Sequence, residues 1–165
     1  MDLKEALLNI PAERLASIAE FYGLAPYRDP GTKKCTCDPN LAESLASHLI
    51  IPANILVAMN GLNDEEMLAL RLITISGGGQ GVVVEQCHQK LNQLSRKWRR
   101  NGFKVIEGLI ARGLVFTRRE GYRQIYFVPE NLRQLLSRFF LGSIFQKVSL
   151  DASRFVTRHG VDFAA

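Results

Sequence analysis

The sequence predicts a mainly α-helical protein, in which an N-terminal helical lobe precedes a winged helix-turn-helix with a β-hairpin wing and a C-terminal helix. Two patterns support this prediction. Apolar residues recur at helical spacing through most of residues 3–110, and the period changes to that of β-strands after Gly113. The composition agrees, because 47% hydrophobic and 22% charged residues in a chain of 165 are typical of a globular protein with a buried core.

Residues 1–61 are expected to form the helical lobe. Pro11 is placed to begin a second helix, since the missing N–H of a proline costs little in a first helical turn. Residues 25–40 are typical of a loop, and further helices are expected from about residues 41 and 52, with Asn60-Gly61 as a stop signal. The apolar positions of the first two helices are Leu3, Leu7, Leu8, Ile10, Leu15 and Ile18.

Residues 62–140 are expected to form the winged-helix domain. Asn63 is a good N-cap for its first helix, and Glu66, three residues later, completes a capping box. The glycine-rich run 77–81 ends that helix and is interpreted as a flexible linker. A second helix is expected over about residues 82–94 and a third from Val105 towards Gly113, with Asn101-Gly102 as the turn between them.

The wing is predicted from two β-rich runs, residues 114–119 and 122–128, that are separated by Glu120-Gly121. Pro129 ends the second strand, and a C-terminal helix is expected from there through Phe139. Residues 141–165 contain helical fragments without a decisive pattern. We interpret them as a C-terminal extension, either a linker or the end of a piece cut from a longer protein.

The charges are distributed unevenly along the chain. Residues 1–95 contain seven Lys and Arg against eleven Asp and Glu, a balance of −4, whereas residues 96–138 contain eleven against three, a balance of +8. Such asymmetry is expected of a surface that binds nucleic acid, although an acidic protein partner would also suit it.

The basic residues fall on the elements with which a winged helix contacts DNA. In such folds the third helix enters the major groove and the wing lies against adjacent backbone. These side chains are expected to neutralise phosphates of duplex DNA, and Trp98 among them either stacks on a base or belongs to the core. The candidate DNA-binding residues are Arg96, Lys97, Arg99 and Arg100 before the third helix, Lys104 in its first turn, and Arg118, Arg119 and Arg123 around the wing tip.

Two alternatives to DNA binding remain open at this stage. The same basic face could dock a protein, because winged helices are also common interaction adaptors. A ligand-responsive transcription regulator is the other alternative, and it would need a dimerisation helix, for which only residues 139–155 are available.

Several ordered segments resemble a known family. PAERL (11–15) with YGL (22–24), LAESLA (41–46), ALRLI (69–73), ARGLVF (111–116) and VPENLR (128–133) together resemble a bacterial helicase-associated domain that is similar to the N-terminal region of XPB-type DNA helicases. The resemblance covers roughly residues 3–138. It implies an accessory module of DNA repair or transcription, with a helicase or another protein as a partner.

The sequence contains no pattern of catalytic residues, so we expect no enzymatic activity and no cofactor. The Gly-x-x-x-x-Gly-Lys-Ser/Thr pattern of a P-loop is absent, and the chain therefore cannot itself be a helicase motor. His48, His88 and His159 lie in no known catalytic arrangement and are expected to be ordinary helix-surface residues. The acidic run Asp64-Glu65-Glu66 suits a helix N-terminus without any metal.

The cysteines and the hydropathy suggest a cytoplasmic protein. Cys35, Cys37 and Cys87 are an odd number in a chain that needs no disulfides, and no apolar run reaches the length of a membrane span. The two close cysteines could bind zinc together with Cys87 and His88 or with His48, but the spacing is poor for zinc, so we expect no metal. Cys87 is expected in the core, and no membrane partner is expected.

Overall fold

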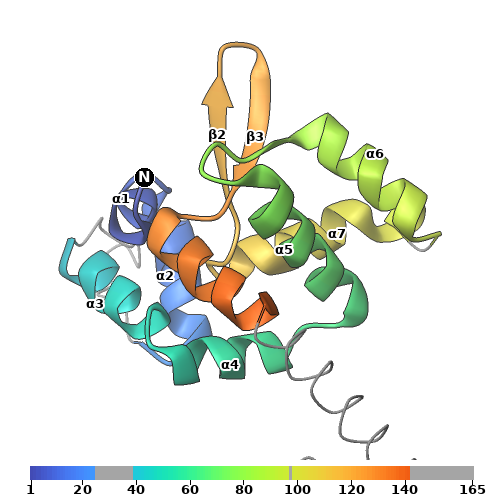
Figure 1. Cartoon of the computed structure of the whole chain (residues 1–165). Helices are drawn as coiled ribbons and strands as arrows, with labels where there is room; N and C mark the ends of the chain where they lie inside the picture. The colour runs from blue at the N-terminus through green and yellow to red at the C-terminus, as the bar shows by residue number, and fades with distance from the viewer. Residues whose placement is uncertain (25–38, 97, 142–165) are drawn as a thin grey trace, which may run out of the picture.

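The computed structural model describes residues 1–24, 39–96 and 98–141, and it confirms the predicted fold class (Figure 1). A helical lobe is followed by a winged helix-turn-helix with a hairpin wing and by a C-terminal helix. The strands form one antiparallel sheet in the order β1-β3-β2.

The lobe contains α1 (Leu3–Leu8), α2 (Ala12–Phe21), α3 (Pro39–Leu49) and α4 (Pro52–Asn60). Local signals in the sequence set where these helices begin. Asp2 accepts a hydrogen bond from the backbone N–H of Glu5 at 2.8 Å, and Glu5 accepts one from the backbone N–H of Asp2 at 3.2 Å, which is a capping box. Pro11 precedes α2 and Pro52 begins α4, as expected of prolines at helix starts.

The winged helix-turn-helix follows in the order α5 (Asp64–Gly77), β1 (Val82–Val83), α6 (Val84–Leu94), α7 (Trp98–Ala111), β2 (Phe116–Glu120) and β3 (Arg123–Phe127), and residues 130–141 form the C-terminal helix. The predicted capping box of α5 is present. The side chain of Asn63 accepts from the backbone N–H of Glu66 at 2.8 Å, and Glu66 accepts from the backbone N–H of Asn63 at 3.3 Å.

The second helix begins later than the sequence predicts, because Val82 and Val83 form a strand instead. They pair with Tyr126 and Ile125 of β3, more than 40 residues away in the sequence. Gly81 allows the chain to approach β3 closely, because it has no Cβ: an added Cβ would lie 2.6 Å from the backbone oxygen of Tyr126. Its φ of +85° also favours glycine. The glycine-rich run 77–81 therefore includes a position fixed by the sheet, which its interpretation as a flexible linker missed.

The third helix begins earlier than predicted, at Trp98, and the Asn101-Gly102 pair lies inside it rather than in a turn. Gly102 is buried in step with Val105, Ile106 and Leu109, so it belongs to the buried face of α7. Tertiary packing thus overrides the low helix propensity of glycine. As a result, residues 99 and 100 lie in the first turn of α7 and Lys104 follows in the second, not in the first.

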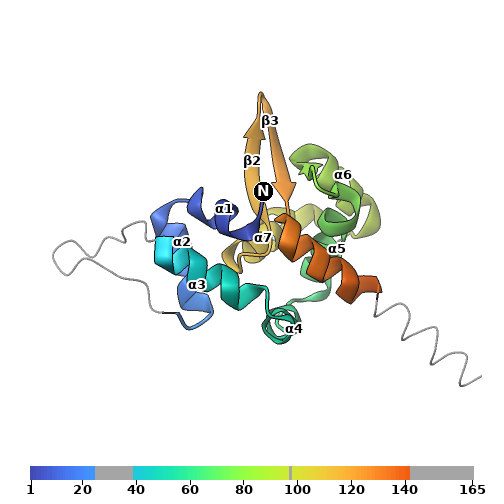
Figure 2. The same ribbon diagram turned by 60° about the vertical axis from the view of Figure 1, so that its left-hand side comes forward.

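The wing turns one residue later than expected, at Gly121-Tyr122. Glu120 pairs with Arg123 directly across this two-residue turn. Gly121 has a φ of +60°, which the first central position of the tight hairpin turns requires and which glycine adopts without strain. Figure 2 shows the hairpin projecting from the helical body beside α6.

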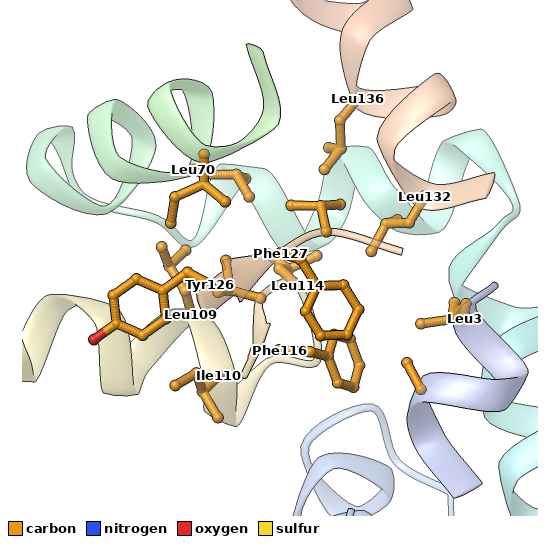
Figure 3. Close-up of a cluster of buried hydrophobic side chains, with 14 of the residues drawn as sticks. Leu3, Leu70, Leu109, Ile110, Leu114, Phe116, Tyr126, Phe127, Leu132 and Leu136 are labelled. Carbon is orange, nitrogen blue, oxygen red and sulfur yellow. The ribbon is translucent and has the colours of Figure 1, made fainter. Parts of the chain in front are cut away.

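The lobe and the winged helix bury a single cluster of hydrophobic side chains. Figure 3 shows Leu3 of α1 in this cluster with Phe116 of β2 and Leu132 of the C-terminal helix. Backbone contacts add to it, because the N–H of Leu3 donates to the side-chain oxygen of Asn131 at 2.9 Å and the N–H of Glu130 donates to the carbonyl of Met1 at 3.0 Å.

A buried ion pair also links the start of α5 to the end of α7. Arg112 donates to Glu66 at 2.6 Å, and the two side chains are only 18% and 10% exposed. The same guanidinium donates to the carbonyls of Gly108 and Gly61, and it lies 5.4 Å from the centre of the Phe21 ring in α2. Glu66 thus has two roles: the capping box, which the sequence predicts, and the ion pair, which only the structure reveals.

Candidate nucleic-acid interface

Two adjoining hollows lie beside α6, one against the wing and one against α7. We call them the wing hollow, of about 370 Å³, and the helix hollow, of about 480 Å³. Both are bordered by Val84 and Glu85, so they adjoin, and we call the two hollows together the basic groove. The wing hollow is also lined by Val83, Gln86, Arg119, Tyr122, Arg123 and Gln124, and the helix hollow by His88, Asn92, Arg100, Asn101, Gly102, Phe103 and Lys104.

The strand register explains why Arg119 and Gln124 face this groove, whereas Arg123 lines the wing hollow from the first position of β3, beside the turn. Arg119 pairs with Gln124, and Thr117 pairs with Tyr126 on the same face of the hairpin. That face is turned towards α6, because the hydroxyl of Tyr126 lies 3.2 Å from Nε2 of His88. Arg119 and Gln124 therefore point into the space between the wing and α6.

Arg118 lies on the opposite face of the hairpin, because side chains alternate along a strand. Its guanidinium donates to the backbone carbonyl of Gln80, pairs with Glu120 at 3.0 Å and lies 5.2 Å from the ring centre of Phe127. Arg118 thus holds the wing against the linker before β1 and lines neither hollow.

In α7, Arg100 and Lys104 are one helical turn apart and therefore lie on the same face. Both line the helix hollow and both are exposed. Among the predicted residues whose side chains the structure describes, four line the groove: two come from α7 and two, Arg119 and Arg123, from the wing.

The four groove cations are available for a ligand. Within the described part of the chain, Arg100, Lys104, Arg119 and Arg123 form no ion pair, whereas Arg112, Arg118 and Arg133 each do. Glu85 is the one acid among the described residues that line the groove. The groove lining therefore has a net positive charge that no ion pair among the described residues neutralises.

Of the predicted residues not yet placed, the structure describes the side chain of Arg96 alone. Arg96 is exposed in the link between α6 and α7 and lines neither hollow. Lys97 and the side chains of Trp98 and Arg99 lie outside the described residues.

Two aromatic residues at the groove were not among the predicted site residues. Phe103 is 73% exposed in the helix hollow, and Tyr122 is fully exposed at the wing tip. The sequence gives no signal for the exposure of Phe103, because its spacing from Ile106 and Ile110 is that of one buried helix face. Tyr122 could have been found only after the turn was placed correctly.

His88 contacts the rings of both Phe103 and Tyr126. Its ring centre lies 4.6 Å from that of Phe103, and the rings are inclined by 35°. Burial lowers the pKa of His88 below its ordinary value, because desolvation disfavours the charged imidazolium. His88 is half-buried on α6 and contacts α7 and the sheet, so it is not the ordinary helix-surface residue that the sequence suggests.

The other candidate chemical groups have structural surroundings. His48 is half-buried, and its backbone carbonyl accepts from the side-chain amide of Asn54 at 2.8 Å. Cys87 is in the core as predicted, and burial raises the pKa of its thiol to about 11. Across residues 1–24, 39–96 and 98–141, no three His, Cys, Asp or Glu side chains are grouped so that they could hold a metal ion. Cys35, Cys37 and His159 lie outside the described residues.

In the described ranges, no single helix is both long and apolar enough to cross a membrane. The pair α3 and α4 meets those two criteria only in combination, with a bend of 81° at the break.

No protein-family model, curated protein or solved structure compared with this chain matches it.

Proposed function

We propose that this chain is a non-catalytic DNA-binding module that holds duplex DNA in the basic groove, mainly by its phosphate backbone. One observation carries the proposal. Four exposed cations without ion pairs in the described structure meet at one groove, two from the third helix of a winged fold and two from its wing. Positive side chains in that arrangement neutralise phosphates and release counterions, which is the main source of affinity for DNA.

The biological setting rests on the sequence. The resemblance to a helicase-associated domain supports a role beside a helicase in repair or transcription, with the motor on a partner or elsewhere, because this chain has no P-loop. A DNA partner and the odd number of cysteines suit a cytoplasmic location.

The first test measures DNA affinity as a function of salt. Fluorescence anisotropy of a labelled random duplex is titrated with the protein at several salt concentrations. Four neutralised phosphates give a slope of log K against log salt of about −3.6, since each contributes about −0.9. The variant Arg119→Glu/Arg123→Glu should lose at least about tenfold in affinity, because it reverses two phosphate contacts.

The matched control reverses two exposed cations outside the groove. Arg14→Glu/Arg138→Glu changes the net charge by the same amount, so any effect of overall charge is equal in the two variants. Equal losses in both variants would refute the groove as the binding site. Absence of binding even at low salt would refute the DNA function and leave an acidic protein as the partner of this face.

Glu85 provides a test in the opposite direction. Its carboxylate borders both hollows, so it repels phosphates that approach from either side. Glu85→Gln should raise duplex affinity by about fivefold at low salt, the effect expected for one charge pair near water-exposed groups. The same change at Glu43, which is exposed on α3 outside the groove, should leave the affinity unaltered.

A further inference from the structure

We propose that the helix hollow binds an unpaired nucleobase, so that the module favours DNA in which a duplex meets a single strand. This inference rests on the proposed function, because it assigns a ligand to one half of the same groove. It depends on three features of the hollow: an exposed aromatic face, a hydrogen-bond acceptor without a partner, and two adjacent cations.

The aromatic face belongs to Phe103. With 73% of its surface exposed, this residue contributes little to the core, although positions 102, 105 and 106 of the same helix are buried. Its ring lies against that of His88, which holds it at the wall of the hollow. Exposed aromatic faces bind unpaired bases by stacking, and they do so with any base, because every base has a π face.

The unpartnered acceptor belongs to Asn92 on α6. Its Oδ1 atom is buried and has no hydrogen-bond partner among the described residues, and the side chain lines the same hollow as Phe103. A buried acceptor without a donor costs free energy. Rotation of the amide, whose terminal torsion is broad, would turn it towards an N–H group on the edge of a base stacked on Phe103.

The cations provide the contact for the attached backbone. Arg100 and Lys104 flank Phe103 on α7, line the same hollow and form no ion pair with other described residues. A nucleotide has an aromatic base next to a phosphate, which is the combination that this hollow offers. An acidic peptide would satisfy the cations but would not need an aromatic face, so an unpaired nucleotide is the better fit.

The test compares two DNAs that share one duplex sequence. One is a blunt duplex, and the other is a fork with single-stranded arms in which the first unpaired base is 2-aminopurine. We expect the fork to bind about tenfold more tightly, the smaller part of the range measured for one stacked base. We also expect the 2-aminopurine fluorescence to fall on binding, because stacking quenches it.

Substitutions at Phe103 assign the effect to the hollow. Phe103→Leu should lower fork affinity to that of the blunt duplex and abolish the quenching, whereas Phe103→Trp should retain both. Val57→Ala on α4 is the matched control, since Val57 is 72% exposed but lies outside the groove. Circular dichroism of each variant verifies that the fold is unchanged.

The outcomes separate this inference from the proposed function. Binding of the blunt duplex with no preference for the fork would overturn the inference alone. An equal loss on both DNAs in Phe103→Leu would also overturn it, because Phe103 would then be a duplex contact. No binding of either DNA by the wild-type protein would overturn the proposed function as well.

Discussion

The ion pair between Glu66 and Arg112 should contribute strongly to stability, and it can be tested by replacing Arg112 with Met. Methionine keeps much of the volume but removes the charge and the hydrogen bonds. The Glu66 carboxylate, 10% exposed, then loses a donor at 2.6 Å and, among the described residues, retains the hydrogen bond from the backbone of Asn63 alone. Breaking a buried pair in this way costs about 3–5 kcal/mol, and the partial exposure of Arg112 favours the lower value of about 3 kcal/mol.

Urea unfolding followed by circular dichroism measures this change as a shift of the midpoint at constant m-value. In thermal unfolding, about 3 kcal/mol corresponds to a fall in Tm of roughly 6–12 °C for a chain of this length. A double-mutant cycle isolates the pair. Glu66→Gln is the suitable partner change, because glutamine at that position still completes the capping box, and we expect a coupling energy of about 2 kcal/mol between the two sites.

Arg133→Met is the control for the loss of an arginine. Arg133 pairs with Glu130 within one helix, and those side chains are 24% and 43% exposed, so the change should cost less than about 1 kcal/mol. The reasoning fails if Arg112→Met costs no more than Arg133→Met, or if the effects of Arg112→Met and Glu66→Gln simply add.

Three further predictions follow from single residues. In a urea titration, Gly81→Ala should lower the free energy of unfolding by at least about 2 kcal/mol, because the added methyl group clashes with the backbone of Tyr126 and the φ is unfavourable for alanine. The control is Gly23→Ala, at a φ of +75° with open space around it, which should cost only about 1 kcal/mol in the same titration. Burial lowers the pKa of His88, so the unfolded chain binds a proton more strongly, and the free energy of unfolding should fall as the pH drops below about 6.5. Urea unfolding at several pH values should show that the free energy of unfolding depends less steeply on pH in His88→Gln than in the wild-type protein. An equally steep dependence in the two proteins would contradict the lowered pKa of His88. The pKa of about 11 keeps Cys87 as a thiol, so iodoacetamide at pH 8 should leave it unmodified in the native protein and label it in urea, as read by peptide mass spectrometry.

Local signals in the sequence were sufficient for most helix starts. Asn63 and Glu66 predicted the start of α5, because a capping box involves only neighbouring residues. The charge asymmetry likewise identified the half of the chain that supplies the groove cations. The change of period after Gly113 predicted the hairpin, although it placed the turn one residue too early.

The tertiary structure decided the features that depend on distant partners. The strand formed by Val82 and Val83 exists because β3 lies beside it, and no local pattern distinguishes two such valines from the start of a helix. Similarly, Asn101-Gly102 has the local preference of a turn, but burial of Gly102 against the core makes it helical.

The candidate site shows the same division between local and distant information. The sequence alone determined that Arg118 and Arg119 lie on a strand and therefore point to opposite faces, since side chains alternate. Only the packing of β3 against α6 decided that Arg119 faces the groove and that Arg118 is held by Gln80 and Glu120. Alternation is a property of the backbone of one strand, whereas the choice of face depends on which apolar side is buried against the rest of the fold.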